Sequence, residues 1–347
     1  MTSPTLPTYA PLVRFGRGGR TESVHFGALA VVDRTGRLLL AAGDPTTVVF
    51  MRSSAKPFQA LPFVADGGPE HFGLDDADLA LICASHTGRE EHTRRVAALL
   101  ARAGLTPAAL QCGVHPPADP ETATALACRG EAPTPLHHNC SGKHTGMLLR
   151  ARMHGWDTAT YLDPEHPVQR DIRAALARFA GLPPEALALG TDGCSAPNFA
   201  LPLYHAAWAW ARLADPTDLD EPWATAARRI TAAMTAHPEM VGGPGRFDTE
   251  LMRALGPAVV AKAGAEGYQA LGLAAGNWPG ASGGVGIALK IADGDARNRA
   301  RGMVALALLQ RAGLLPEGIP PNLTRWAPTG PVTNWRGLEV GTHEVLL

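Results

Sequence analysis

The sequence predicts an α+β fold in which one antiparallel sheet, built from both ends of the chain, packs with helices around an inserted helical lobe. Three observations predict it: a hairpin pattern near the amino end, a second group of β-rich segments near the carboxyl end, and apolar residues at helical spacing between them. Because strands and helices do not alternate regularly, a parallel doubly wound sheet is not expected.

The amino-terminal and middle elements follow from local patterns. Residues 24–32 are rich in β-forming residues, residues 33–36 read Asp-Arg-Thr-Gly and suit a turn, and residues 37–40 resume an apolar run, so a hairpin is predicted. Apolar residues at helical spacing, with proline near several starts, predict five helices in the middle of the chain. They cover residues 91–103, 142–154, 167–180, 197–213 and 222–236.

The carboxyl-terminal part is expected to complete the sheet. Three short strand candidates separated by glycine-rich turns lie at residues 258–262, 268–274 and 284–291, and a last helix is predicted at 295–312. The tail, residues 316–347, is rich in proline and then extended, which favours an edge strand or a partner contact. We predict a single unit over residues 1–347, with a sheet lobe at about 1–60 and 255–347, a helical lobe at about 61–254, and a cleft between them.

Composition excludes several classes of protein. The 347 residues carry a formal net charge of −1, from 31 basic and 32 acidic residues, without a long basic run, so nucleic acid is not an expected partner. No apolar run has the length of a signal peptide or a membrane span, and we expect neither membrane association nor export but a cytoplasmic protein. Five cysteines without an export signal do not suggest disulfides. Three of them are expected to pack as small hydrophobic residues: Cys83, Cys112 and Cys128.

A serine and a lysine stand three residues apart at the start of a predicted helix. They are Ser53 and Lys56, in the segment Arg-Ser-Ser-Ala-Lys that begins at Arg52. A serine hydroxyl is a weak nucleophile unless a neighbour takes its proton, and a lysine can do so if burial or a nearby cation lowers its pKa. Taken alone, a serine before a helix is also a common N-cap, so this motif leaves both interpretations open.

Two polar loops contain further candidates. One reads Ser85-His86-Thr87-Gly88, where glycine permits close backbone approach and the three side chains suit a ligand cradle, although an ordinary loop before a helix fits as well. The other follows the strand-like residues 186–189 and includes Asp192 and Cys194.

The stretch 137–146, His-His-Asn-Cys-Ser-Gly-Lys-His-Thr-Gly, has an unusual density of polar side chains at a predicted helix start. Cys140 and His144 are four residues apart, which is metal-ligand spacing on a helix, and Lys143 is three from Cys140. With Cys194 from the second loop, these side chains could close on one soft metal ion. The spacing favours His144 over Lys143 and leaves open whether a metal is bound.

Two cationic residues come later in the chain. Arg246 lies in a Gly/Pro-rich loop at residues 237–248 that ends in Asp248, a predicted helix N-cap, and its guanidinium can clamp a carboxylate in bidentate fashion. A solvated lid residue is the alternative. Lys262 ends a predicted strand, where most lysines are solvated.

The order Ser53-x-x-Lys56, a second serine loop at Ser85, and Lys262-Ala-Gly resembles the three-part pattern of penicillin-binding proteins, serine β-lactamases and related glutaminases. Ala263 departs from their K-T-G pattern, which disfavours a β-lactam ligand. Longer strings identify the chain as similar to the asparaginase II family, related to the inducible, thermolabile Rhizobium-type L-asparaginase. They are R-S-S-A-K-P from Arg52, S-H-T-G from Ser85, H-N-C-S-G-K-H from His138, G-T-D-G-C-S-A-P-N from Gly190 and H-P-E-M-V-G-G-P-G-R-F-D from His237.

This resemblance implies a serine β-lactamase-like fold and an amidohydrolase acting on L-asparagine. It implies two serine–lysine pairs, Ser53 with Lys56 and Ser85 with Lys262. It also implies a homodimer and one zinc ion held by Cys140, Lys143 and Cys194, although lysine must lose its proton to bind a metal.

The expected mechanism is attack by Ser53 on the side-chain amide while Lys56 takes its proton, followed by hydrolysis of the acyl-enzyme. The alternatives are a glutaminase or other amidase, a penicillin-interacting enzyme, and a zinc-binding protein without enzymatic activity. Because a small zwitterion needs paired opposite charges, six residues are expected to bind substrate. They are Arg52, His86, Asn139, His144, Asp192 and Arg246.

Overall fold

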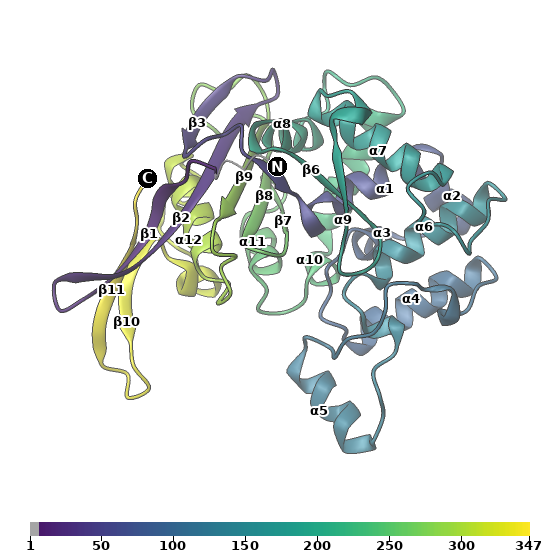
Figure 1. Cartoon of the computed structure of the whole chain (residues 1–347), viewed down its shortest axis with the longest axis horizontal. Helices are drawn as coiled ribbons and strands as arrows, with labels where there is room; N and C mark the ends of the chain where they lie inside the picture. Colours follow the sequence, from purple (N-terminus) through teal and green to yellow (C-terminus); the bar gives the residue numbers. More distant parts are fainter. Residues whose placement is uncertain (1–6) are drawn as a thin grey trace, which may run out of the picture.

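The larger sheet of the protein is antiparallel and takes strands from both ends of the chain (Figure 1). In the computed structural model, which describes residues 7–347, it has eight strands in the order β10-β11-β1-β2-β9-β8-β7, with β3 paired to β2. The strands are β1 (Ala10–Arg17), β2 (Arg20–Asp33), β3 (Leu38–Ala42), β7 (Val259–Ala263), β8 (Tyr268–Leu273), β9 (Val285–Ile291), β10 (Thr329–Thr333) and β11 (Glu339–Val345). The predicted fold class is confirmed.

The predicted strands are present with small shifts at their ends. The hairpin after residue 24 is β2 and β3, the three strands between residues 258 and 291 are β7, β8 and β9, and the extended tail supplies β10, which lies at the edge of the sheet, and β11. Strand β1 was not predicted, because Pro11 and Gly16 interrupt its alternating pattern and its pairing with β11 joins the two ends of the chain. Residues 1–6, which the prediction assigned to the sheet lobe, lie outside the described residues.

The helices lie mostly between the two groups of strands, as predicted. They are α1 (Lys56–Ala65), α2 (Gly68–Phe72), α3 (Asp76–Ile82), α4 (Glu90–Arg102), α5 (Pro120–Arg129), α6 (Ser141–Met153), α7 (Pro167–Ala180), α8 (Leu203–Ala214), α9 (Trp223–Ala236), α10 (Pro238–Val241), α11 (Phe247–Leu255) and α12 (Ala300–Arg311). None of the helices within residues 7–347 has both the length and the apolar character needed to cross a membrane. The boundary between the two lobes stays a prediction.

The predicted helix at residues 197–213 was wrong in its first six residues. They form β6 (Pro197–Pro202), which pairs with β4 (Val48–Phe50) and β5 (Ala188–Thr191) in a second, three-stranded sheet. Pro202 cannot donate the hydrogen bond that a helix interior needs, so α8 begins only after it. The small sheet fixes the approach to the short 3-10 helix η1 (Arg52–Ala55), which leads directly into α1.

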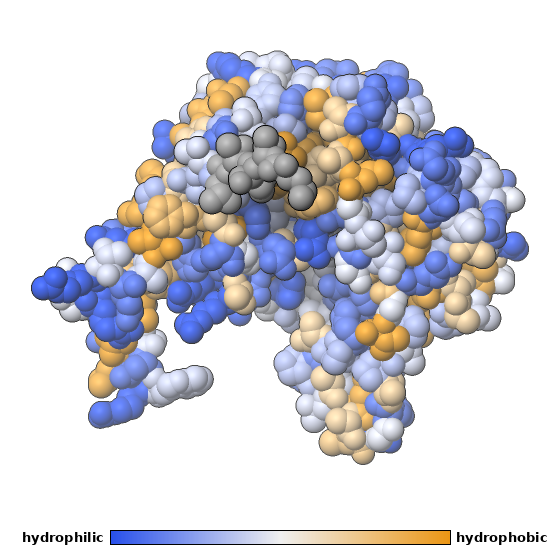
Figure 2. Space-filling view, viewed as in Figure 1, coloured by the Kyte–Doolittle hydropathy of each residue, from blue (hydrophilic) through white to orange (hydrophobic). Residues whose placement is uncertain are grey.

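Helix α8 packs against β2, β8 and β9 and anchors the helical lobe on the sheet. Gly286 of β9 makes this close approach possible, because a Cβ atom there would lie 1.8 Å from the carbonyl oxygen of Ala207. Two projections, the β10–β11 hairpin and the α5 region, extend from the body of the molecule (Figure 1). Figure 2 shows that the surface between them is recessed and largely hydrophilic.

Candidate active site

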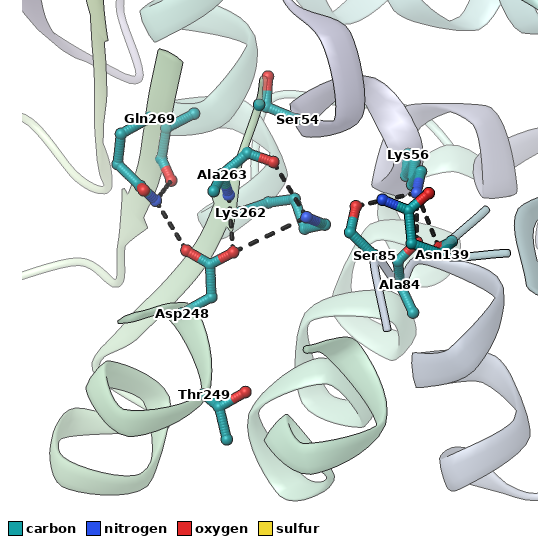
Figure 3. A network of polar contacts seen from close by, with 12 residues as sticks. Ser54, Lys56, Ala84, Ser85, Asn139, Asp248, Thr249, Lys262, Ala263 and Gln269 are labelled. Atoms are coloured by element: carbon teal, nitrogen blue, oxygen red, sulfur yellow. Dashed lines mark hydrogen bonds and ion pairs between the residues drawn. The ribbon is translucent and has the colours of Figure 1, made fainter. Parts of the chain in front are cut away.

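Lys56 is buried at the point where three segments of the helical lobe meet. Its side chain begins α1, and its Nζ donates to Oγ of Ser85 at 2.9 Å, to the carbonyl oxygen of Ala84, and to that of Asn139 at 3.4 Å. The residue is only 1% exposed. One amino group therefore joins α1 to the loop after α3 and to the loop before α6 (Figure 3).

Ser53 lies in η1 and lines the cavity beside this contact. Within residues 7–347 no hydrogen bond joins Ser53 to Lys56, so the structure brings Lys56 against Ser85, and the pairing of Ser53 with Lys56 stays a prediction. Its neighbour Ser54 is fully buried and donates to the carbonyl oxygen of Met51, which is a structural contact within the turn.

Lys262 approaches the site from β7, and it is not solvated but 1% exposed. Its Nζ donates to the carbonyl oxygen of Ala263 at 3.0 Å and lies 3.7 Å from Oδ2 of Asp248. Burial lowers the pKa of Lys262 to about 7, against the opposing effect of Asp248 and with a further lowering by Lys56. In the view of Figure 3, Ser85 lies between Lys262 and Lys56.

The two serines open onto one cavity of about 370 Å³. Its walls include Ser53, Ser85, Asn139, Arg246 and the turn at residues 263–266 after β7. A larger cavity, of about 700 Å³, lies between α4, α5 and α10 and is lined mainly by charged side chains. Of these two cavities, the smaller one is the one that Ser53 and Ser85 line.

Arg52 and Asp192, both predicted to bind substrate, form an ion pair and do not line this cavity. Arg52 donates from Nε to Oδ1 of Asp192 at 2.7 Å, and its backbone N–H donates to Oδ1 of Asn198. Although burial raises the pKa of Asp192, Lys143 and Arg52 outweigh it, and the pKa is lowered, so the carboxylate is the stable form. The cations that do line the cavity are Arg246 and Arg301.

The histidines of the motif loops mainly hold those loops. Both ring nitrogens of His86 are engaged, by Oγ of Ser141 at 2.8 Å and by the N–H of Gly88, so His86 has no atom left for the substrate it was expected to bind. His144 is fully buried in α6, and its Nδ1 lies 2.6 Å from the hydroxyl of Tyr161 rather than in the cavity.

The loop before α6 is fixed by two more histidines. Nε2 of His115 accepts from the N–H of Asn139, and Nδ1 of His138 accepts from the N–H of Cys140. These contacts explain part of the unusual composition of residues 137–146, because the side chains satisfy backbone donors in an irregular buried segment.

Cys140, Lys143 and Cys194 form a second buried cluster beside the cavity. Nζ of Lys143 donates to Sγ of Cys194 at 2.9 Å. Its hydrogen bond with Cys194, and then Lys56 and Lys143, hold the pKa of Cys140 well below its usual range, although burial opposes this. All five cysteines are free thiols, and Cys128 is exposed instead of packed as predicted.

Sequence reasoning missed the buried polar groups behind Lys262. Asp248 was expected to be the N-cap of the following helix, but Arg246 occupies that position, and Asp248 lies in the first turn of α11 with its side chain directed at β7. Gln269, on β8, donates to Asp248 at 2.9 Å and was not singled out. The small number of lysines is a sequence signal for this region, because the chain has only four. The structure buries three of them here, namely Lys56, Lys143 and Lys262.

An antiparallel sheet with an inserted helical lobe, and buried lysines beside serines at their junction, define an amidohydrolase of the Ser-Lys type. The chain belongs to the L-asparaginase II family, whose sequence model matches residues 13–345.

Solved structures with a similar fold are distant in sequence. A Bacillus subtilis glutaminase, YbgJ, in a covalent complex with 5-oxo-L-norleucine is 13% identical, with 83% of this chain and 88% of that chain covered and a TM-score of 0.39. A Bacillus glutaminase studied at 4.3 M NaCl is 15% identical over 83% and 91%, with a TM-score of 0.39. The protein Mglu in its native form is 15% identical over 83% and 63%, with a TM-score of 0.43. No curated protein matches the sequence.

Proposed function

We propose that the protein is an L-asparaginase that hydrolyses the side-chain amide of L-asparagine to L-aspartate and ammonia. The observation that carries this proposal is the contact of Lys56 Nζ with Ser85 Oγ at 2.9 Å, beside Ser53 in a cavity of about 370 Å³. A cavity of this size, with cationic and acidic side chains on its wall, suits a small amino acid better than a polymer.

In the proposed reaction, Oγ of Ser53 attacks the amide carbon, and its proton passes to Lys56. Ser85, hydrogen-bonded to Lys56, relays a proton to the leaving nitrogen, so that the C–N bond breaks and ammonia departs. Water then attacks the acyl carbon and gives a proton to Lys262, and the ester bond to Ser53 breaks to release aspartate as Oγ of Ser53 takes that proton from Lys262. The backbone N–H at the start of the Ser53 helix receives the oxyanion in both steps.

The substrate's charged groups are assigned by complementarity. Arg246 and Arg301 are the cations on the cavity wall, and we assign Arg246 to the α-carboxylate. We assign Asp192, which is held in place by Arg52, to the α-amino group, and Asn139 lies on the cavity wall. His86 and His144 support the loops instead.

We propose that Cys140, Lys143 and Cys194 hold the zinc ion that the resemblance implies. Burial lowers the pKa of Lys143, but Cys194 and Cys140 outweigh it and the pKa is raised, so zinc would have to displace a proton from Lys143. All three side chains are buried, two are thiols, and the lowered pKa of Cys140, caused first by its hydrogen bond with Cys194, favours the thiolate that zinc binds. Within residues 7–347 no group of three or more His, Cys, Asp or Glu side chains is arranged to hold a metal ion, so Lys143 is needed as the third ligand. Bound zinc would neutralise the thiolates and fix the two loops.

Zinc content tests this assignment. Because Cys194 contributes one of two thiolates, Cys194→Ser should lower zinc from about one ion per chain to less than half, with activity reduced but not lost, since the nucleophile is a serine. Metal analysis of the purified protein measures this. Cys128→Ser is the matched control, because Cys128 is exposed on α5 and should leave zinc unchanged. Equal zinc in both variants would contradict the proposed ligand set.

Substrate preference tests the proposed function itself. We expect kcat/KM for ammonia release to be at least about tenfold higher with L-asparagine than with L-glutamine, because one additional methylene in a fitted pocket is worth about 1–3 kcal/mol. A preference for glutamine would make the protein a glutaminase. No ammonia from either amide would overturn the proposal.

A homodimer in the cytoplasm completes the proposal. Trp335 and Leu338 are exposed at the tip of the β10–β11 hairpin, where an apolar contact with a second copy would cover them. Light scattering on the samples used for the assays should give the mass of two chains.

A further inference from the structure

We propose that Asp248, oriented by Gln269, is a positioning residue that holds Lys262 and the end of β7 at the reaction site. The inference rests on the proposed function, in which Lys262 accepts a proton. Asp248 does not line the cavity; it acts through Lys262 and through the backbone of Ala263.

Both carboxylate oxygens of Asp248 are engaged by the sheet. Oδ2 accepts the backbone N–H of Ala263 at 2.7 Å and lies 3.7 Å from Nζ of Lys262, while Oδ1 accepts from Nε2 of Gln269 at 2.9 Å. These contacts link α11 to β7 and β8 (Figure 3). The carboxylate is therefore fixed in position as well as buried.

The position of β7 explains why an acceptor is needed here. Strand β7 is the last strand of the sheet. Every second backbone N–H of β7 therefore points outward, where no neighbouring strand can accept its hydrogen bond. The N–H of Gly264 pairs inward with the carbonyl of Tyr268, and that of Ala263 consequently points outward, to Asp248. Without Asp248, the strand end that carries Lys262 would lose its outer anchor.

The charge of the side chain has a second effect. The groups that face Lys262 are Asp248 from α11, Lys56 from α1, Arg246 from the preceding loop, Cys140 from the loop before α6, and Cys83 at the end of α3. Burial lowers the pKa of Lys262, and Asp248 is the strongest opposing influence. A hydrophobic residue could fill the same space, but it would neither accept the N–H of Ala263 nor balance the buried ammonium group.

Asp248→Asn tests the inference because it removes the charge and keeps the shape. Activity should rise with pH as Lys262 loses its proton, so the acid limb of the kcat/KM profile for asparagine should lie near pH 7 in the wild type. Loss of the carboxylate favours the neutral amine, and the limb should move to lower pH by about one unit or more, while kcat falls about tenfold because Lys262 is less well held.

A second readout does not depend on turnover. The chain has four lysines, Lys56, Lys143, Lys262 and Lys290, so the ε-carbon NMR signals of the protein labelled at lysine can be assigned by substitution and followed with pH. The signal of Lys262 should titrate at lower pH in Asp248→Asn than in the wild type. If the wild type releases no ammonia, the proposed function fails, and this titration still decides the inference.

Two further variants separate positioning from stability. Asp33→Asn removes another buried carboxylate, one that binds the β2–β3 turn far from the site. This variant should have a lower Tm, but the acid limb of its kcat/KM profile should not move. Gln269→Leu keeps the charge of Asp248 but frees its Oδ1, so kcat should fall about fivefold with the limb unchanged. Either of two results would overturn the inference. The first is a folded Asp248→Asn variant in which neither the acid limb of the kcat/KM profile nor the titration of Lys262 has moved. The second is a Gln269→Leu variant with the kcat of the wild type.

Discussion

Ser53→Ala should retain no more than about one part in 10⁴ of the wild-type kcat for asparagine, because the variant has no hydroxyl to form the acyl-enzyme. The side chain is small and lies at the cavity wall, so Tm should stay within about 2 °C of the wild type. Ammonia release under saturating asparagine, with thermal unfolding of the same sample, measures both quantities.

Ser54→Ala is the matched control for this result. Ser54 is adjacent in the chain, but its hydroxyl is buried and bonded to the carbonyl of Met51, so its loss should affect stability more than turnover.

Ser85→Ala provides the decisive comparison, because the structure gives Ser85 rather than Ser53 a lysine partner. A relay residue should cost about 10²–10³ in kcat, which is less than a nucleophile. If Ser85→Ala abolishes turnover and Ser53→Ala does not, the roles of the two serines are reversed.

The fold could be predicted from sequence wherever a local pattern decides the structure. The hairpin at β2 and β3 and the strands β7 to β9 combine β-forming residues with turn signals, and the long helices have clear apolar spacing. Strand β1 and the six residues of β6 were missed although each pairs with a neighbouring strand, β2 and β5 respectively, because each is also held by a partner that lies far away in the chain, β11 and β4. Tertiary contacts, and not local propensity, determine those segments.

The candidate site could be predicted as a set of residues but not as a set of contacts. The motifs carry Ser53, Lys56, Ser85, Lys262 and the cysteines into one region, because each motif lies at the beginning or the end of a helix or strand near the cavity that Ser53 and Ser85 line. Which lysine contacts which serine depends on side-chain direction, which the motif spacing does not encode.

The chain uses far more arginine than lysine, and most of its few lysines lie at this site. Of 31 basic residues, four are lysines and therefore 27 are arginines (31 − 4), and three of those lysines are buried beside the serines or thiols. Arginine stays protonated in proteins, whereas lysine can lose its proton when buried. The proton transfer and metal binding that we propose for these residues therefore call for lysine and could not be served by arginine.

Because lysine can lose its proton and arginine cannot, we expect substitution of Lys56 to cause the second large loss of activity. Lys56→Met, which nearly preserves volume, should lower kcat about 10³–10⁴-fold, because neither serine then has a group to accept its proton. Lys56→Arg should be about equally inactive, since a guanidinium cannot give up its proton at neutral pH. Steady-state ammonia release from both variants measures this.

Stability should respond in a way that separates the chemical role from the structural one. Lys56→Met leaves the carbonyls of Ala84 and Asn139 and the hydroxyl of Ser85 without their shared donor, at a cost of about 1–3 kcal/mol for each buried group that stays unpaired. Removal of a buried polar amino group offsets part of this cost. The net loss in the free energy of unfolding should therefore be modest compared with the loss of activity.

Lys290→Met is the control, because Lys290 is the remaining lysine and is only partly buried, on β9. It should keep kcat within about threefold of the wild type, as expected for a side chain outside the proton pathway. If Lys56→Met is folded and retains more than about a tenth of wild-type turnover, Lys56 is not the base for either serine. The proton would then have to leave through Lys262, whose pKa near 7 makes it the other amine able to accept one.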